Sequence, residues 1–133
     1  MSWASWSEKY ATGHAGMDQG HRRLMELINQ LADAMESNKP MSFCSDLLER
    51  FIEHTRMHFL AEEQLMDRIR YPKAKEHKAL HEMLVTDVLA FKASYDSGTT
   101  AQFVTLLVIL DCWLERDISA ADKELADFVA VPH

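Results

Sequence analysis

Long apolar runs are missing from this sequence. The longest, Phe103 to Leu110, is interrupted by Thr105 and is much shorter than the roughly 20 apolar residues that a membrane-spanning helix needs. The N-terminus, Met-Ser-Trp-Ala-Ser-Trp-Ser-Glu, also lacks the basic start and the apolar core of a signal peptide. Both absences favour a chain that is neither inserted into a membrane nor exported, and we expect a cytoplasmic protein.

Cysteine and positive charge are scarce as well. The two cysteines, Cys44 and Cys112, lie in apolar helical patterns without a CxxC spacing, so we expect buried free thiols in a reducing compartment. The 14 Lys and Arg residues face 21 Asp and Glu residues, which gives a net charge of −7. This charge argues against nucleic acid and against an anionic membrane surface as partners.

Apolar residues at helical spacing occupy most of the chain, and no stretch alternates as a β-strand does. The spacing predicts four long helices and one short C-terminal helix, at about 18–38, 42–70, 73–95, 100–117 and 122–131. Residues 1–17 are rich in aromatic side chains and are expected to form an ordered arm across the helices. We therefore predict one all-α domain, residues 1–133, folded as an up-down-up-down four-helix bundle.

Helix boundaries are marked by a few polar residues and prolines. Asp18 is the expected N-cap of the first helix, and Ser42 or Ser45 that of the second. Pro72 removes a backbone donor and disfavours helix at Tyr71, so the second helix is expected to end there.

Histidine and carboxylate residues gather around that break. His58 and Glu62 are four residues apart, and so are His77 and His81. Residues at this spacing lie on one face of a helix, one turn apart. A short turn at Pro72 would make the two helices antiparallel, so both pairs can face the same interior. Imidazole nitrogens and carboxylate oxygens suit Fe, Mn or Zn, and the pattern predicts a metal site inside the bundle.

Other helices offer further donors to the same interior. His21 is expected from the first helix, and Asp117 and Asp122 from the end of the fourth. Burying four imidazoles together with unpaired carboxylates is costly unless a cation compensates them. A pair of metal ions bridged by carboxylates would satisfy the whole set.

These residues, with their order and spacing, resemble the hemerythrin family, in particular its single-domain bacterial members. The resemblance covers almost the whole chain and rests on the following motifs: Trp6…Tyr10-x-x-Gly13, Asp18-x-x-His21, His58-Phe59-x-x-Glu62-Glu63-x-x-Met66, Tyr71-Pro72, His77-x-x-x-His81, Trp113-Leu114 and Asp122. The family holds a non-haem di-iron centre that binds dioxygen reversibly.

The resemblance implies a ligand set and a pair of cofactor ions. His21 and His58 would hold one iron, His77 and His81 the other, and Glu62 and Asp122 would bridge them. The implied cofactor is two non-haem Fe ions with carboxylate and oxo or hydroxo bridges. Phe59, Trp113, Leu114 and Ile118 would form an apolar wall around the ligand pocket and control solvent access.

One position departs from the family pattern, because Asp117 stands where the family has a third histidine on the second iron. The aspartate side chain is shorter and carries negative charge. We include Asp117 among the candidate metal ligands, and three arrangements are open: direct ligation through one oxygen, contact through a water, or a side chain turned away that leaves an open position.

The spacing of Asp117 and Asp122 predicts irregular backbone. Five residues on a regular helix rotate about 500°, which leaves two side chains about 140° apart. Both can face one site only if the helix contains a π-type turn or ends between them. We expect this irregularity near Ser119 to Ala121.

The remaining histidines are expected outside the ligand set. His54 would lie near the site as a hydrogen-bonding or solvent-facing residue, and His14 and His133 would lie on the surface. The leading functional hypothesis is a dioxygen-binding protein for storage, delivery or sensing, with an unidentified redox partner. The alternatives are a peroxidase- or oxidase-like di-iron enzyme, favoured by the extra carboxylate of Asp117, and a signalling or metal-handling module, which would need a partner surface.

Overall fold

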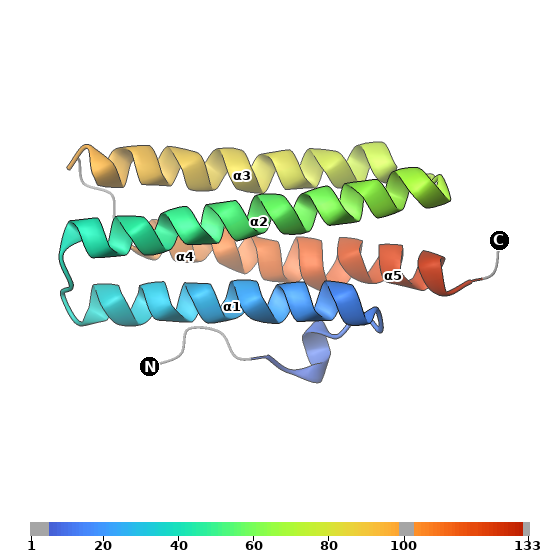
Figure 1. Ribbon diagram of the computed structural model, residues 1–133, viewed down its shortest axis with the longest axis horizontal. Helices are drawn as coiled ribbons and strands as arrows, with labels where there is room; N and C mark the ends of the chain where they lie inside the picture. The colour runs from blue at the N-terminus through green and yellow to red at the C-terminus, as the bar shows by residue number, and fades with distance from the viewer. Residues whose placement is uncertain (1–5, 99–102, 132–133) are drawn as a thin grey trace.

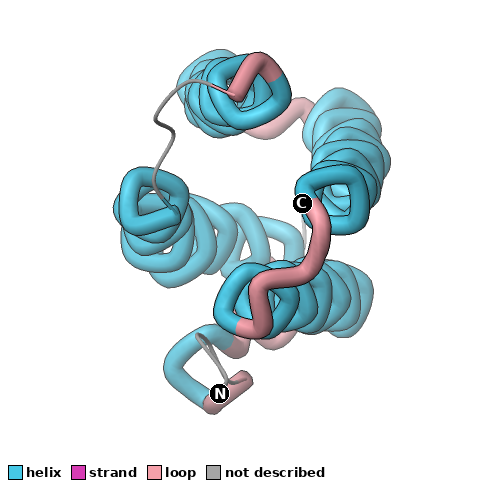
Figure 2. The backbone as a smooth tube through the Cα atoms, turned by 90° about the vertical axis from the view of Figure 1, so that its left-hand side faces the viewer, coloured by secondary structure: helices cyan, strands magenta, loops and turns pink. Residues whose placement is uncertain are grey.

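The computed structural model describes residues 6–98 and 103–131, and these form an all-α bundle, as predicted. The elements follow in the order η1 (Glu8–Tyr10), α1 (Ala15–Glu36), α2 (Met41–Ile69), α3 (Ala74–Asp96), α4 (Phe103–Cys112), η2 (Trp113–Asp122) and α5 (Lys123–Ala130). In Figure 1, α1, α2 and α3 run side by side, and α4, η2 and α5 continue one another as the fourth rod. Figure 2 looks along the bundle and shows the four rods around a common interior.

The start of α1 differs from the prediction. His14 is the N-cap, and its Nδ1 accepts a hydrogen bond from the backbone N–H of Met17 at 3.2 Å. Asp18, the expected cap, lies inside the first turn and accepts hydrogen bonds from the backbone N–H and the hydroxyl of Thr12 instead. The chain turns back at Gly13, whose φ is +89°, and this turn places Thr12 of the arm within hydrogen-bond distance of Asp18. His14 is therefore half-buried rather than a plain surface residue.

The described part of the N-terminal arm, from Trp6 onward, packs on the bundle as expected, and residues 1–5 lie outside the described residues. The Arg22 guanidinium lies 4.6 Å from the centroid of the Trp6 ring, within range of a cation–π contact. Tyr10 and Trp6 also pack against the main apolar core. The arm thereby covers part of α1 beside the turn that carries His21.

The boundaries of α2 arise from backbone geometry rather than from a serine cap. Pro40 is the N-cap, with no side-chain hydrogen bond, so neither Ser42 nor Ser45 has the predicted role. Asn38 adopts a left-handed conformation and Pro40 then starts the helix, which leaves both serines inside it. At the other end Arg70 is left-handed, with φ +56°, and the helix ends before Tyr71 and Pro72, as predicted.

Two apolar clusters flank the polar interior. The larger contains Leu24, Phe51, Leu84 and Trp113, and the smaller contains Met17, Met66, Tyr71 and Leu125. His21 follows Met17 and precedes Leu24 along α1, and Glu62, His77 and Asp122 have corresponding positions on the other rods. The apolar clusters therefore close the polar site at both ends of the bundle.

The two cysteines differ in their surroundings. Cys44 is buried and free, as predicted, but Cys112 is exposed. The prediction for Cys112 was wrong because α4 is apolar on its outer face too. Cys112 lies four residues after the exposed Val108 and therefore on the outer stripe. Among the described residues, no helix combines the length and the apolarity needed to cross a membrane.

The predicted backbone irregularity is present and is longer than expected. A π-helix, η2, extends from Trp113 to Asp122, and regular α-helix resumes at Lys123. A π-helix has hydrogen bonds from residue i to residue i+5, so residues five apart share a face. Asp117 and Asp122 are consequently both buried, at 2% and 1% exposure.

Candidate metal centre

Six of the seven predicted ligands converge between the helices. Their donor atoms form two groups, and within each group all atoms lie within 4.8 Å of one another. The first group is His21, His58, Glu62 and Asp122, and the second is Glu62, His77, His81 and Asp122. Glu62 and Asp122 belong to both. The helical spacing on α2 and α3 and the π-turn of η2 thus present their donors to one interior.

Each shared carboxylate divides its two oxygens between the two histidine pairs. Glu62 Oε2 lies 2.5 Å from His58 Nε2 and 3.7 Å from His21 Nε2, whereas Oε1 lies 2.9 Å from His77 Nε2 and 3.1 Å from His81 Nε2. Asp122 Oδ2 lies 2.8 Å from His21 Nε2, and its Oδ1 lies 2.9 Å from His77 Nε2. Both carboxylates therefore span the site.

Several of these atoms have no hydrogen bond among the described residues although they are buried. They are both ring nitrogens of His21, Nε2 of His58, Oε2 of Glu62 and Oδ1 of Asp122. His21 Nε2 and His58 Nε2 lie close to carboxylate oxygens, but the angles are not those of hydrogen bonds. Buried polar atoms are rarely left unsatisfied. Nitrogens and oxygens aimed at common points fit a borderline divalent cation such as iron.

Without a metal, the negative charges of Glu62 and Asp122 are balanced by protons on the neighbouring imidazoles. Burial opposes charge on Glu62, but the four imidazoles around it, that of His21 first, hold the pKa of this carboxyl well below its usual range. Burial also disfavours charge on His21 and His77, yet Asp122 and Glu62 raise the pKa of His21 to about 9 and that of His77 to about 10. A metal cation must displace these protons, because ligating imidazole is neutral.

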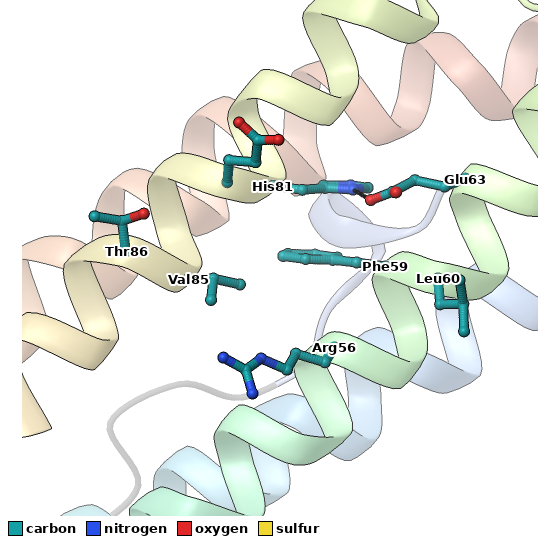
Figure 3. A pocket seen from close by; sticks show the side chains of 8 residues that line it. Arg56, Phe59, Leu60, Glu63, His81, Val85 and Thr86 are labelled. Carbon is teal, nitrogen blue, oxygen red and sulfur yellow. Dashed lines mark hydrogen bonds and ion pairs between the residues drawn. The ribbon is translucent and has the colours of Figure 1, made fainter.

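His81 is oriented by two further side chains of α2, which Figure 3 shows from close by. Its Nδ1 lies 3.0 Å from Glu63 Oε2, and its ring stacks on Phe59 at 3.7 Å with an interplanar angle of 2°. A carboxylate on the far nitrogen fixes the ring and raises its basicity toward a metal. The sequence alone indicates no such role for Glu63, because the contact depends on the packing of α3 against α2.

The four residues predicted to form the apolar wall lie in the interior of the bundle. Phe59, Trp113, Leu114 and Ile118 are all buried, at 0–5% exposure. The Trp113 ring meets His21 edge-on, with centroids 6.4 Å apart. His54 is half-buried and belongs to neither donor group, in agreement with the expectation. His133 lies outside the described residues.

Asp117 is buried but belongs to neither donor group. Its Oδ1 accepts a 2.8 Å hydrogen bond from Arg116 Nε, and its Oδ2 is buried without a hydrogen bond among the described residues. Burial raises the pKa of the Asp117 carboxyl, and the Arg116 guanidinium partly opposes this rise.

Gly20 is a further site residue that sequence reasoning missed. A Cβ atom at this position would lie 2.2 Å from Nδ1 of the His58 ring, far inside van der Waals contact. The His58 ring thus occupies the space of a side chain at position 20. The available signal was a glycine inside a helix, which costs up to about 1 kcal/mol relative to alanine and calls for a compensating reason.

Gly20→Ala is therefore expected to displace His58 and to weaken metal binding roughly 10- to 100-fold, the range for changes that misorient a ligand. Competition of iron-loaded protein against a chelator measures the loss. Gly16→Ala is the matched control on α1, because its Cβ would meet only the His14 ring, at 3.2 Å. Equal iron retention by the two variants would contradict this role of Gly20.

Fold and site together define a four-helix-bundle protein with an interior histidine–carboxylate cluster suited to a metal. The hemerythrin HHE cation binding domain model matches residues 12–129. The chain belongs to the hemerythrin family. It is 29% identical over 129 residues to a bacteriohemerythrin of Stenotrophomonas maltophilia (strain R551-3), covering 97% of this chain and 83% of the relative. It is 28% identical over 120 residues to a hemerythrin-like protein of Naegleria gruberi, covering 90% and 88%. Family and donor set support a non-haem iron protein.

Proposed function

We propose that the cluster holds two iron ions. His21 and His58 would ligate one ion, His77 and His81 the other, and Glu62 and Asp122 would bridge them. The observation that carries this proposal is the division of each carboxylate's oxygens between the two histidine pairs. A single ion would leave one pair and two carboxylate oxygens buried without compensation, which is costly.

We further propose that the protein binds dioxygen, for storage, delivery or sensing in the cytoplasm. When bound, the iron pair supplies the redox chemistry on which reversible dioxygen binding depends. The protein orients four imidazoles and excludes water with the buried side chains of Phe59, Trp113, Leu114 and Ile118. Such a wall admits a diatomic molecule more readily than an extended substrate. Neither nucleic acid nor a membrane is part of this proposal, and the redox partner is unidentified.

A second candidate is an enzyme that activates oxygen or peroxide. The observation that favours it is the buried carboxylate of Asp117 beside the cluster, because added negative charge stabilises the ferric state. The two functions are distinguished by mixing reduced, iron-loaded protein with dioxygen. A spectral change that reverses on deoxygenation supports binding, and prompt oxidation supports the enzyme. A signalling role would instead require a partner that responds to the state of the site.

Iron analysis of protein purified from iron-replete cells tests the dinuclear centre. We expect two irons per chain, because the six converging residues form two donor groups. An optical spectrum of the same sample reports whether the ions share bridging ligands. A reproducible maximum of one iron or fewer in fully loaded protein would rule out the dinuclear proposal.

A further inference from the structure

Arg116 and Asp117 form an ion pair at the edge of the metal cluster. Arg116 Nε lies 2.8 Å from Asp117 Oδ1, with side-chain exposures of 37% for the arginine and 2% for the aspartate. The arginine thus reaches in from the surface, and the carboxylate is enclosed. Asp117 Oδ2 is buried and has no hydrogen bond among the described residues. Arg116 therefore holds Oδ1 of Asp117, whereas Oδ2 is available to accept a hydrogen bond.

The π-helix brings Asp117 to the site without placing it among the donors. Asp117 and Asp122 lie five residues apart in η2 and are both buried, so they share its inner face. Asp122 belongs to both donor groups, so Asp117, five residues earlier on the same face, lies beside the cluster. Yet only Asp122 belongs to those groups. Asp122 contacts His21 and His77, whereas Asp117 contacts Arg116.

We propose that Arg116 is a positioning residue that holds Asp117 beside the second iron rather than on it. This inference rests on the proposed di-iron function. The position that a third histidine fills in the family would then stay open to a small exogenous ligand. Asp117 Oδ2 would face that ligand as a hydrogen-bond acceptor with negative charge.

A carboxylate in that place selects the class of ligand. It accepts a hydrogen bond from a neutral ligand that carries an O–H group, such as water or hydrogen peroxide, and hydrogen bonds to charged groups are the stronger ones. It repels small anions, because like charges at close range in a buried site interact strongly. Dioxygen carries no hydrogen and gains nothing from the contact. The geometry therefore favours neutral hydroxylic ligands over anions.

Azide is a suitable probe, because it is a small anion whose binding to ferric iron can be followed by absorption. The experiment compares azide dissociation constants of iron-loaded, oxidised wild type, Asp117→Asn, Arg116→Gln and the double variant. Asparagine keeps the shape and an oxygen for Arg116 but removes the charge. Arg50→Gln, at an exposed position of α2, is the matched arginine control. Iron content and circular dichroism are measured on every variant.

Asp117→Asn is expected to bind azide about tenfold more tightly, since a neutral side chain no longer repels it. Arg116→Gln is expected to bind azide about tenfold more weakly, because the released carboxylate can occupy the open position. The double variant should regain the tight binding of Asp117→Asn, and Arg50→Gln should match wild type.

An azide affinity in Arg116→Gln equal to that of wild type would overturn the positioning role. An unchanged azide affinity in Asp117→Asn would overturn the proposed selection of neutral ligands over anions. If Arg116→Gln does not fold, the Asp117→Asn measurement alone decides the proposal. If either of these contradicting results is obtained with protein that holds two irons per chain, only this inference fails and the proposed function stands. Absence of iron from the wild type would instead remove the proposed function on which it rests.

Discussion

Glu62→Ala is expected to remove both irons from the protein, whereas Glu63→Ala should only weaken their binding. Glu62 lies within ion-pair distance of four imidazoles and belongs to both donor groups. Its loss would remove a bridge and leave four buried imidazoles without their shared carboxylate. Glu63 contacts the outer nitrogen of His81, and loss of such a partner costs roughly 10- to 100-fold in metal affinity.

The measurement is iron content after dialysis, followed by chelator competition for variants that keep iron. Glu53→Ala is the matched control, because Glu53 is exposed on the same helix. The expected order of iron retention is Glu53→Ala, then Glu63→Ala, then Glu62→Ala. Equal retention in the Glu62 and Glu63 variants would contradict the assignment of the inner face of α2.

Asp117→His is expected to prolong the spectral change that dioxygen produces in the reduced, iron-loaded protein. Negative charge near a metal favours the higher oxidation state, so Asp117 should lower the ferric/ferrous potential and shorten that change in wild type. Arg116 is 37% exposed and screened by water, so it offsets only part of this charge. Histidine removes the charge and supplies the family's third imidazole.

The expected rise in potential is at least roughly 60 mV, which is a tenfold change in a one-electron equilibrium. Redox titration and time-resolved absorption after mixing with dioxygen measure the two effects. Asp111→His, at an exposed position of α4, is the control. If wild type keeps its spectral change as long as Asp117→His does, Asp117 does not tune the site. A shorter life in the variant would reverse the assigned effect.

The predictions that failed concern helix caps and exposure. Asp18 had the composition of an N-cap, but its carboxylate binds Thr12 of the arm, and His14 caps the helix. Ser42 and Ser45 were plausible caps, but the backbone at Pro40 starts α2 without them. In each case the path of the preceding chain decided where the helix begins and which side chain, if any, caps it. The capping preferences of individual residues do not predict the path of the preceding chain.

The amino-acid sequence by itself determined which residues share a helix face. Spacings of four residues align His58 with Glu62 and His77 with His81. A spacing of five lets Asp117 and Asp122 face one site only if the helix contains a π-type turn or ends between them. These relations are local, because backbone hydrogen bonds within one helix set them. The all-α bundle and six converging donors could therefore be predicted before any contact between helices was known.

Only the tertiary structure decided how the helices meet around those donors. The division of the Glu62 oxygens between two histidine pairs and the bond from Glu63 to His81 each join α2 to another helix. The place of the His58 ring over Gly20 depends on the same packing. Such distances follow from helix rotation and separation, which many side chains far apart in the sequence set together. For the same reason the pattern left the position of Asp117 open, and its contact with Arg116 inside the packed π-helix shows where it lies.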